Sequence, residues 1–332
     1  MANNCLWLMT DLGFEAFLQL EEWFEVVDQS KDGPILFQDP ADFVHRLKRN
    51  MVTALVLPTF LPLSPPLFEE LRRQSHPLGC VGYLGLTDDR WDWEVVASSP
   101  MPIFYPAETY ASTQAEYALG ALITVLRNIH LADLELRTTP PDQTQDFQLW
   151  RERFVGTELR GKTVGFLGWD ALAAALVPVL TQFFGCKVKV WLTDCHSPTP
   201  APQVPSDLPL VVVRERMDLF RDVDILSLHL TPLSSPVLTE ELLGTNPGVV
   251  VVNLTSALVL PEETLLTTYE QDHLAGAVID TFDFGPTSYS PELLAIPRVL
   301  ATPRLAAVTA EVEERASDQL AKDLVTWART HT

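Results

Sequence analysis

From residue 162 onward, short apolar runs alternate with segments of helical periodicity, and this alternation limits the possible folds more than any other feature. The runs are rich in valine and leucine and are too short for ordinary helices, whereas the segments between them repeat apolar residues at helical spacing. They lie at 162–169, 187–192, 224–230, 248–255, 276–282 and 298–303. Strands that alternate with helices form a parallel sheet covered on both faces. We therefore expect a doubly wound α/β domain of the nucleotide-binding type.

The first hundred residues carry the same alternation in a smaller region. Apolar runs that we expect to be strands lie at 5–10, 53–58, 78–85 and 102–105. Helical patterns cover 11–27 and 65–74, and the second begins with prolines, which favour a helix start. We expect one long helix over 109–135 and an amphipathic helix over 309–330. The pattern predicts a second, smaller α/β domain.

The chain of 332 residues has 23 basic and 44 acidic side chains, and its formal net charge is −21. Such a charge repels nucleic acid and anionic membranes, so we expect neither as a partner. The cysteines have no C-x-x-C or metal-ligand spacing, and we expect reduced thiols; they are Cys5, Cys80, Cys186 and Cys195. Prolines interrupt the apolar stretches, and the first residues lack a basic signal-peptide start. These features predict a soluble, cytoplasmic protein.

The segment GKTVGFLGWDALAAALVPVL, residues 161–180, begins like a phosphate-binding turn and then departs from its pattern. A dinucleotide loop reads G-x-G-x-x-G, and the three glycine positions here hold Gly168, Asp170 and Ala173. Alanine is accepted at the third position, but a carboxylate at the second faces two phosphates. The repulsion is on the order of 1–4 kcal/mol per charge pair, or roughly one to three decades in affinity.

Asp170 has two structural interpretations. Directly before ALAAAL, it is suited to be the N-cap of a helix, where its carboxylate satisfies free backbone amides. Alternatively, it points into solvent from a loop that has drifted. Trp169 beside it is expected to fill cofactor space. The acidic residue that would bind the ribose is replaced by Leu192, although Asp194 follows two positions later.

Several segments in register resemble the D-isomer-specific 2-hydroxyacid dehydrogenase family, in particular its phosphoglycerate dehydrogenase-like members. They read FVGTELRGKTVGFLG, VVVNLTSALVLPEETL, HLAGAVIDTFDFGP and PRVLATPRLAAVT. The resemblance implies a Rossmann-like domain over 106–303, inserted in a smaller flavodoxin-like α/β substrate domain of 1–105 plus 304–332. It also implies NAD(H) as cofactor and pairing of subunits through the nucleotide domains, with the helix at 109–135 taking part.

The three side chains that carry the family's chemistry are absent at their matching positions. The arginine that grips the substrate carboxylate is replaced by Ser256 in VNLTSAL, and the glutamate that tunes the histidine is replaced by Gly285. The histidine that shuttles the proton is replaced by Arg304 in TPR. A guanidinium group has a pKa above roughly 12 and cannot exchange protons at neutral pH.

Two further residues are candidates for a remodelled site. His229 ends the strand at 224–230 and is either an acid or base near the cofactor or a structural residue. Asp280 is expected to lie near Arg304, where the two form an ion pair or bind a polar ligand. In the substrate loop that keeps Gly85, Asp88 and Asp89 add negative charge or belong to a solvated turn.

Three functions follow from these substitutions. In the first, the chain has lost hydride transfer, takes no cofactor and acts as a regulatory, scaffold or partner subunit, in a homodimer or in a heterodimer with an active homologue. In the second, it is an NAD-dependent 2-hydroxyacid dehydrogenase or 2-oxoacid reductase with an altered active site. Arg304 and Arg90 would then hold an acidic substrate, while His229 or a water moves the proton. In the third, it binds a small ligand without a dinucleotide.

Overall fold

The computed structural model of the 332-residue chain describes most of its length and divides it into two compact units. The described residues are 4–28, 39–58, 65–73, 78–85, 99, 101–139, 146–192, 203–230, 238–281 and 289–331. The first unit is formed mainly by Met1–Tyr110 and Val308–Thr332, and the second mainly by Ala111–Cys195 and Ala201–Ala307.

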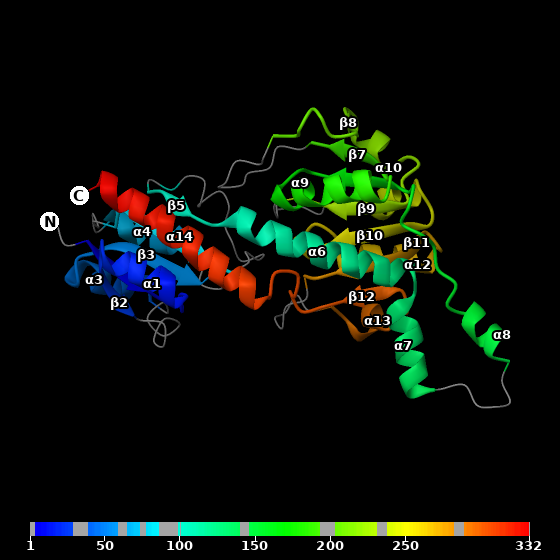
Figure 1. Ribbon diagram of the computed structural model, residues 1–332, viewed down its shortest axis with the longest axis horizontal. Helices are drawn as coiled ribbons and strands as arrows, with labels where there is room; N and C mark the ends of the chain where they lie inside the picture. The colour runs from blue at the N-terminus through cyan, green and yellow to red at the C-terminus, as the bar shows by residue number, and fades with distance from the viewer. Residues whose placement is uncertain are drawn as a thin grey trace. The chain divides into compact units, whose positions relative to one another are not determined.

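The first unit is built on a parallel sheet of five strands in the order β2-β1-β3-β4-β5 (Figure 1). The strands are β1 (Cys5–Leu8), β2 (Glu25–Asp28), β3 (Val52–Pro58), β4 (Cys80–Leu84) and β5 (Ile103–Phe104). Apolar side chains of α1 (Phe14–Glu21) and α14 (Ala310–Thr330) share one core cluster with the sheet. Those of α3 (Pro40–Arg49) and α4 (Pro65–Arg73) share another. This strand order is the flavodoxin-like one that the resemblance implied.

The second unit contains a parallel sheet of seven strands in the order β12-β11-β10-β9-β6-β7-β8. The strands are β6 (Thr163–Leu167), β7 (Lys187–Trp191), β8 (Leu210–Val213), β9 (Ile225–Leu228), β10 (Val249–Asn253), β11 (Leu274–Ile279) and β12 (Val299–Ala301). The chain starts in the middle at β6, runs outward to β8, and returns to the other side of β6 at β9. That reversal is the topological switch point of a Rossmann fold, and the expected doubly wound fold is confirmed.

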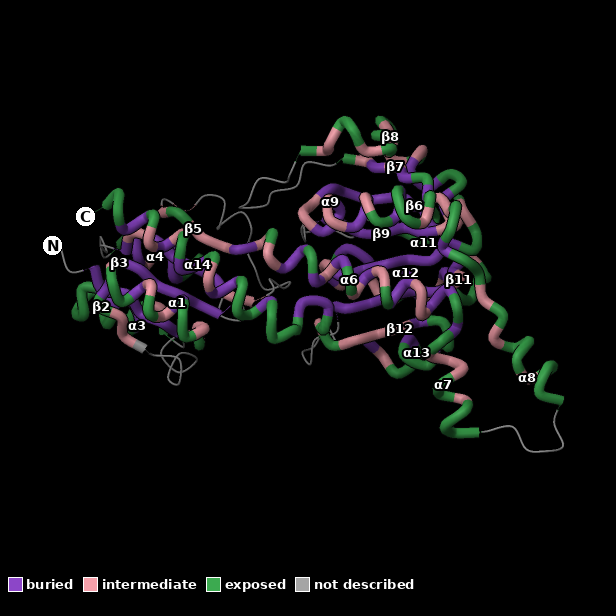
Figure 2. Tube along the Cα trace, in the orientation of Figure 1, coloured by how far each residue is buried: buried purple, intermediate pink, exposed green. Residues whose placement is uncertain are grey.

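Helices cover both faces of this sheet, and its central strands β6, β9, β10 and β11 are almost entirely buried (Figure 2). One core cluster joins α6 (Ala107–Leu126) and α9 (Ala171–Pro178), and α9 continues as a π-helical turn over Val179–Phe183. The other cluster joins helices that follow β8; they are α10 (Arg216–Phe220), α11 (Glu240–Gly244), α12 (Glu262–Glu270) and α13 (Pro291–Leu294). In the part of the chain that the structure describes, no helix is long and apolar enough to cross a membrane.

Three details of the predicted elements are wrong. Residues 25–27, expected at the end of the first helix, belong to β2 (Glu25–Asp28), in which Val26 and Val27 pair beside β1. The edge strand β8 lies in a stretch that the sequence pattern left unassigned. The helix expected over 109–135 is two helices, α6 and α7 (Ile129–Thr138), and a further short helix, α8 (Phe147–Glu152), follows.

The break between α6 and α7 has a local cause. Asn128 adopts a left-handed conformation at φ 52°, and its side-chain amide donates to the carbonyl of Val155 at 3.1 Å. The amide of Thr157 donates to the carbonyl of Leu126 at 2.8 Å. The returning chain therefore occupies the Leu126 carbonyl, which would have accepted the next amide if α6 had continued.

We predict that Gly156→Ala destabilises this junction. A Cβ at residue 156 would lie 2.3 Å from the carbonyl oxygen of Leu126 and 2.7 Å from the Cα of Arg127, and both belong to the backbone. Overpacking of this kind costs about 1–3 kcal/mol of unfolding free energy, measurable by urea denaturation. Gly120→Ala on α6 is the control: its Cβ meets nothing within 4 Å, and the helix propensity of alanine predicts a gain of up to about 1 kcal/mol. Equal stabilities would contradict the prediction.

Candidate functional site

The turn that follows β6 lies at the switch point of the seven-stranded sheet, where doubly wound folds bind their ligands. Gly168 adopts φ +94°, and a Cβ there would lie 2.1 Å from the carbonyl oxygen of His229. The Gly168 amide donates to the backbone carbonyl of Trp191 at 2.9 Å, and the His229 amide donates to the backbone carbonyl of Leu167 at 2.8 Å. Only glycine fits this turn, because the ends of β7 and β9 close against it on either side.

Asp170 is the N-cap of α9, as the first of its two interpretations predicted. Its backbone is extended, and Oδ1 accepts from the amide of Ala173 at 2.7 Å. The same oxygen lies 2.8 Å from Nδ1 of His229, which comes from the end of β9. The carboxylate therefore joins a helix N-terminus to a neighbouring strand, with 40% of its side chain exposed.

His229 is buried in the middle of a row of polar groups. It is 2% exposed, its ring stacks on Phe166 at a centroid distance of 4.9 Å, and Nε2 lies 2.8 Å from Oγ of Ser227. Sequence reasoning missed Ser227, although its spacing of two residues on a strand was an available signal, because alternate residues share one face. Both ring nitrogens of His229 have partners inside the protein.

Opposing effects set the pKa of the Asp170 carboxyl. Desolvation acts to raise it, but the charge and hydrogen bond of His229 and the amides of Ala173 and Leu172 together hold the pKa below its usual range. The side chain is therefore ionised at neutral pH. A permanent negative charge occupies the N-terminus of α9, where the helix dipole favours an anion.

The residues of this loop do not fit the pyrophosphate of a dinucleotide. Phosphate binding needs free amides at the helix N-terminus and close approach of the backbone at the second glycine position. Here the Ala173 amide already donates to Asp170, whose side chain lies at that position. At the ribose position, Leu192 presents a 45% exposed apolar side chain directly after β7. Asp194, the possible substitute, falls outside the described residues.

Trp169 lies in the core and not at the surface of the turn. It is 3% exposed and belongs to the apolar cluster that joins α6 and α9. The expectation that its indole fills cofactor space is therefore wrong. Trp169 turns its side chain inward directly after Gly168, where φ +94° redirects the chain at the end of β6.

Ser256, at the position of the family's arginine, is turned into the protein. It is fully buried, and its Oγ accepts from the amide of Leu258 at 2.9 Å. Asn253, at the end of β10, holds the same turn: its amide group donates to the carbonyl of Ser256 at 2.8 Å, and its Oδ1 accepts from the Thr255 amide at 3.1 Å. The serine hydroxyl serves the backbone and faces no substrate.

Asp280 anchors the turn that carries Arg304. Its two oxygens accept from the hydroxyl of Thr302 at 2.5 Å and from the amides of Leu305 and Ala306, each at 2.7 Å. Burial raises the pKa of this carboxyl, and these donors together with the charge of Arg304 oppose the rise. Arg304 itself adopts φ 56°, so the position of the family's histidine lies in a left-handed turn. Gly285 falls outside the described residues.

In the first unit, the amide of Gly85 is also occupied. It donates to the hydroxyl of Tyr110 at 2.8 Å, and Tyr110 is 4% exposed. Asp88, Asp89 and Arg90, the charged residues predicted to follow this loop, lie outside the described residues. In the described ranges, no group of three or more His, Cys, Asp or Glu side chains is placed to hold a metal ion.

Comparison with known proteins places this site in a family. The model described as "D-isomer specific 2-hydroxyacid dehydrogenase, NAD binding domain" matches residues 119–306. The YoaD protein of Bacillus subtilis (strain 168) is 32% identical over 246 residues, which are 70% of this chain and 66% of that protein. The D-3-phosphoglycerate dehydrogenase of Mycobacterium leprae (strain TN) is 30% identical over 259 residues, which are 77% of this chain and 46% of that enzyme. The chain thus spans about half to two thirds of the length of these relatives.

Two solved structures share the fold at low sequence identity. A glyoxylate reductase from Paecilomyes thermophila superposes with a TM-score of 0.78 at 17% identity, covering 99% of this chain and 96% of that one. The PH0520 protein from Pyrococcus horikoshii OT3 superposes with a TM-score of 0.77 at 20% identity, covering 98% and 92%. At this identity the likeness concerns the fold alone.

We predict that the Asp170 carboxylate stabilises the protein and that acid removes this contribution. Asp170→Ala leaves the Ala173 amide and His229 without their acceptor, and loss of an N-cap costs about 1–2 kcal/mol at pH 7. Because the folded pKa lies below the unfolded value of about 3.9, the stability due to the charge is present above that value and is lost as pH falls through the folded pKa. The contribution of the charge is the difference in unfolding free energy between wild type and Asp170→Asn, measured by urea denaturation at pH 7, 5 and 3.

The difference between the two proteins should shrink toward pH 3. Asp146→Asn is the matched control, because Asp146 caps α8 by accepting from the backbone amides of Gln148, at 2.8 Å, and Leu149. A difference for Asp170→Asn that stays constant with pH would contradict the prediction.

Proposed function

The chain belongs to the D-isomer-specific 2-hydroxyacid dehydrogenase family, and from that premise we propose that it has lost hydride transfer and serves as a regulatory, scaffold or partner subunit. The family consists of NAD-dependent oxidoreductases that act on 2-hydroxy acids. The proposal rests on the residues at two positions that match catalytic residues of the family. Ser256, at the arginine position, is buried, and Arg304, at the histidine position, lies in a left-handed turn.

The chemistry of the family's reaction explains why these substitutions matter. A 2-hydroxy acid needs a cation to hold its carboxylate and a base to take the hydroxyl proton as hydride leaves. Ser256 is neutral, and its hydroxyl is bonded to the backbone. Arg304 cannot accept a proton at neutral pH. His229 is 2% exposed and both its ring nitrogens are engaged, which supports its structural interpretation.

The matched domain is the one that binds NAD in the family, so the comparisons do not support the expectation that the chain takes no cofactor. We therefore propose only that Asp170 weakens the binding of NAD(H), the cofactor that membership of the family implies. The alternative is a dehydrogenase with an altered active site. The match over 119–306 and the dehydrogenase relatives favour it.

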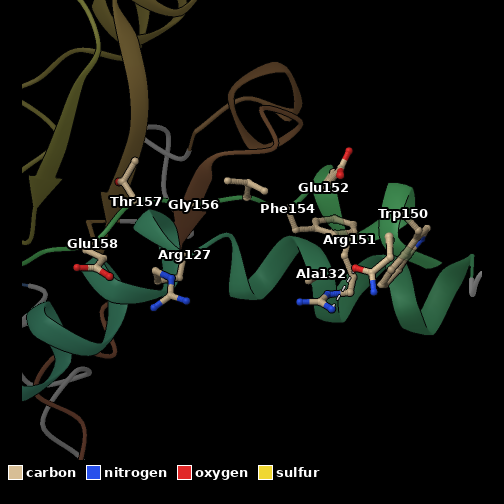
Figure 3. A pocket seen from close by; sticks show the side chains of 11 residues that line it. Arg127, Ala132, Trp150, Arg151, Glu152, Phe154, Gly156, Thr157 and Glu158 are labelled. Atoms are coloured by element: carbon tan, nitrogen blue, oxygen red, sulfur yellow. Dashed lines mark hydrogen bonds between the residues drawn. The ribbon is translucent and has the colours of Figure 1, made fainter. Parts of the chain in front are cut away.

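We further propose that the subunit pairs through α7 and α8. These helices carry large apolar side chains that are more than half exposed; they include Ile129, Leu134, Leu136, Phe147 and Leu149. Between the helices and the returning chain lies a hollow of about 540 Å³, lined by Arg127, Trp150, Arg151 and Phe154 among others (Figure 3). Exposed apolar groups of this density mark an association surface. The partner is a second copy or an active homologue.

Turnover measurements test the loss of hydride transfer. The purified protein is incubated with 2-hydroxy acids and NAD⁺, and with 2-oxo acids and NADH or NADPH, while absorbance of the reduced cofactor is followed. We expect no rate above that of a blank, because no described residue at the matching positions can take the proton. Turnover that disappears in Arg304→Gln would establish the altered active site instead.

Sedimentation equilibrium tests the pairing. We expect wild type to have twice the chain mass of 37.1 kDa. The double variant Leu134→Asp/Phe147→Asp should be a monomer, since both side chains are more than half exposed in the single chain and their replacement costs the fold little. Val211→Asp, at a 61% exposed site on β8, is the control and should keep the mass of wild type. A monomeric wild type would refute pairing of like subunits.

A further inference from the structure

A single oxygen atom of Asp170 connects two elements of the second unit. Oδ1 accepts a hydrogen bond from the amide of Ala173, in the first turn of α9, at 2.7 Å. The same atom lies 2.8 Å from Nδ1 of His229, at the end of β9. Strand register brings the two residues together, because Leu167 of β6 lies opposite Leu228 of β9. The residues that follow these two are Gly168 and His229, so the turn and the histidine meet at the same sheet edge.

The Asp170 carboxylate determines which ring nitrogen of His229 is the donor to it. An ionised carboxylate can only accept, so Nδ1 must carry the proton that it shares with Asp170. Nε2 lies 2.8 Å from the hydroxyl oxygen of Ser227, which can either donate or accept. Both ring nitrogens therefore have partners inside the protein.

We infer that Asp170 is the resident anion of this loop and that His229 is the positioning residue that holds it in the place of the dinucleotide phosphates. The contact is autoinhibitory: the chain's own carboxylate occupies the amides that a phosphate would need. His229 acts as a fixed hydrogen-bond donor, neither acid nor base. This inference rests on the proposed function and names the residues that exclude the cofactor.

A loop without the carboxylate should regain free donors for a phosphate. In Asp170→Gly, the Ala173 amide and the Nδ1 proton of His229 both lose their acceptor and become donors for an incoming phosphate. Glycine is a tolerated N-cap and costs only a few tenths of a kcal/mol relative to aspartate, so the variant is expected to fold. Any gain in NADH affinity should then depend on His229.

The tautomer is tested first, by ¹⁵N NMR of histidine-labelled wild type at pH 7, with His229→Asn to assign the signal. We expect Nδ1 of His229 to carry a proton. A ring protonated at Nε2 alone would overturn its role as donor to Asp170. This measurement involves neither cofactor nor turnover, so its result stands apart from the proposed loss of activity.

NADH binding, followed by isothermal titration calorimetry, tests the resident anion. We expect Asp170→Gly to bind at least tenfold more tightly than wild type, a difference of 1.4 kcal/mol. Asp170→Gly/His229→Asn, in which the asparagine amide replaces the Nδ1 donor, should keep most of the gain, and Asp170→Gly/His229→Leu should lose it. Asp146→Gly, at the exposed cap of α8, is the control and should bind like wild type.

Each contrary result has its own meaning. If Asp170→Gly binds no better than wild type, or if wild type binds at micromolar concentration, the carboxylate is not the block and the inference fails. If the leucine double variant binds as tightly as Asp170→Gly while folded by circular dichroism, His229 has no part in the site. Neither result concerns turnover, which decides the proposed function separately.

Discussion

The hydrogen bond between Asp170 and His229 ties together the part of the molecule where the family would bind its cofactor. It joins the N-terminus of α9 to the end of β9 at 2.8 Å, across the point where the strand order reverses. A helix N-terminus at a switch point attracts anions whatever the sequence around it, because its amides are free and its dipole is aligned. In this chain a side chain supplies the anion. The rest of the site is arranged around a charge that is already present.

The same substitution of internal contacts for ligand contacts recurs at other positions. The hydroxyl oxygen of Ser256 accepts from the Leu258 amide, and both oxygens of Asp280 accept from the turn at 302–306. In the first unit, the amide of Gly85 donates to the Tyr110 hydroxyl. Each polar group is satisfied inside the protein, as burial requires. The sheet and its apolar clusters are preserved independently, since a fold does not need the chemistry of its site.

The sequence predicted the architecture well where burial decides it. The run 248–255 contains four successive valines because a central parallel strand is covered on both faces, and the expected strand there is β10. Prediction failed at the margins. Strand β8, at the sheet edge, is an apolar run of only four residues, LVVV, and two of its valines are exposed, so burial does not decide its place. The break at Asn128 depends on the chain at 155–157, which no local pattern of α6 and α7 reveals.

For the site, the sequence by itself determined the substitutions: a carboxylate in the phosphate loop, a serine for an arginine and an arginine for a histidine. It also indicated that Asp170 suits an N-cap, because capping depends on residues three positions apart. Only the tertiary structure decided that His229 is the partner of that carboxylate and that Ser227 completes the row. The two ends of the contact are 59 residues apart in sequence, and they meet because β6 and β9 pair side by side in the sheet. Hydrogen bonds between distant residues follow from strand order and register, which periodicity along a single segment does not contain.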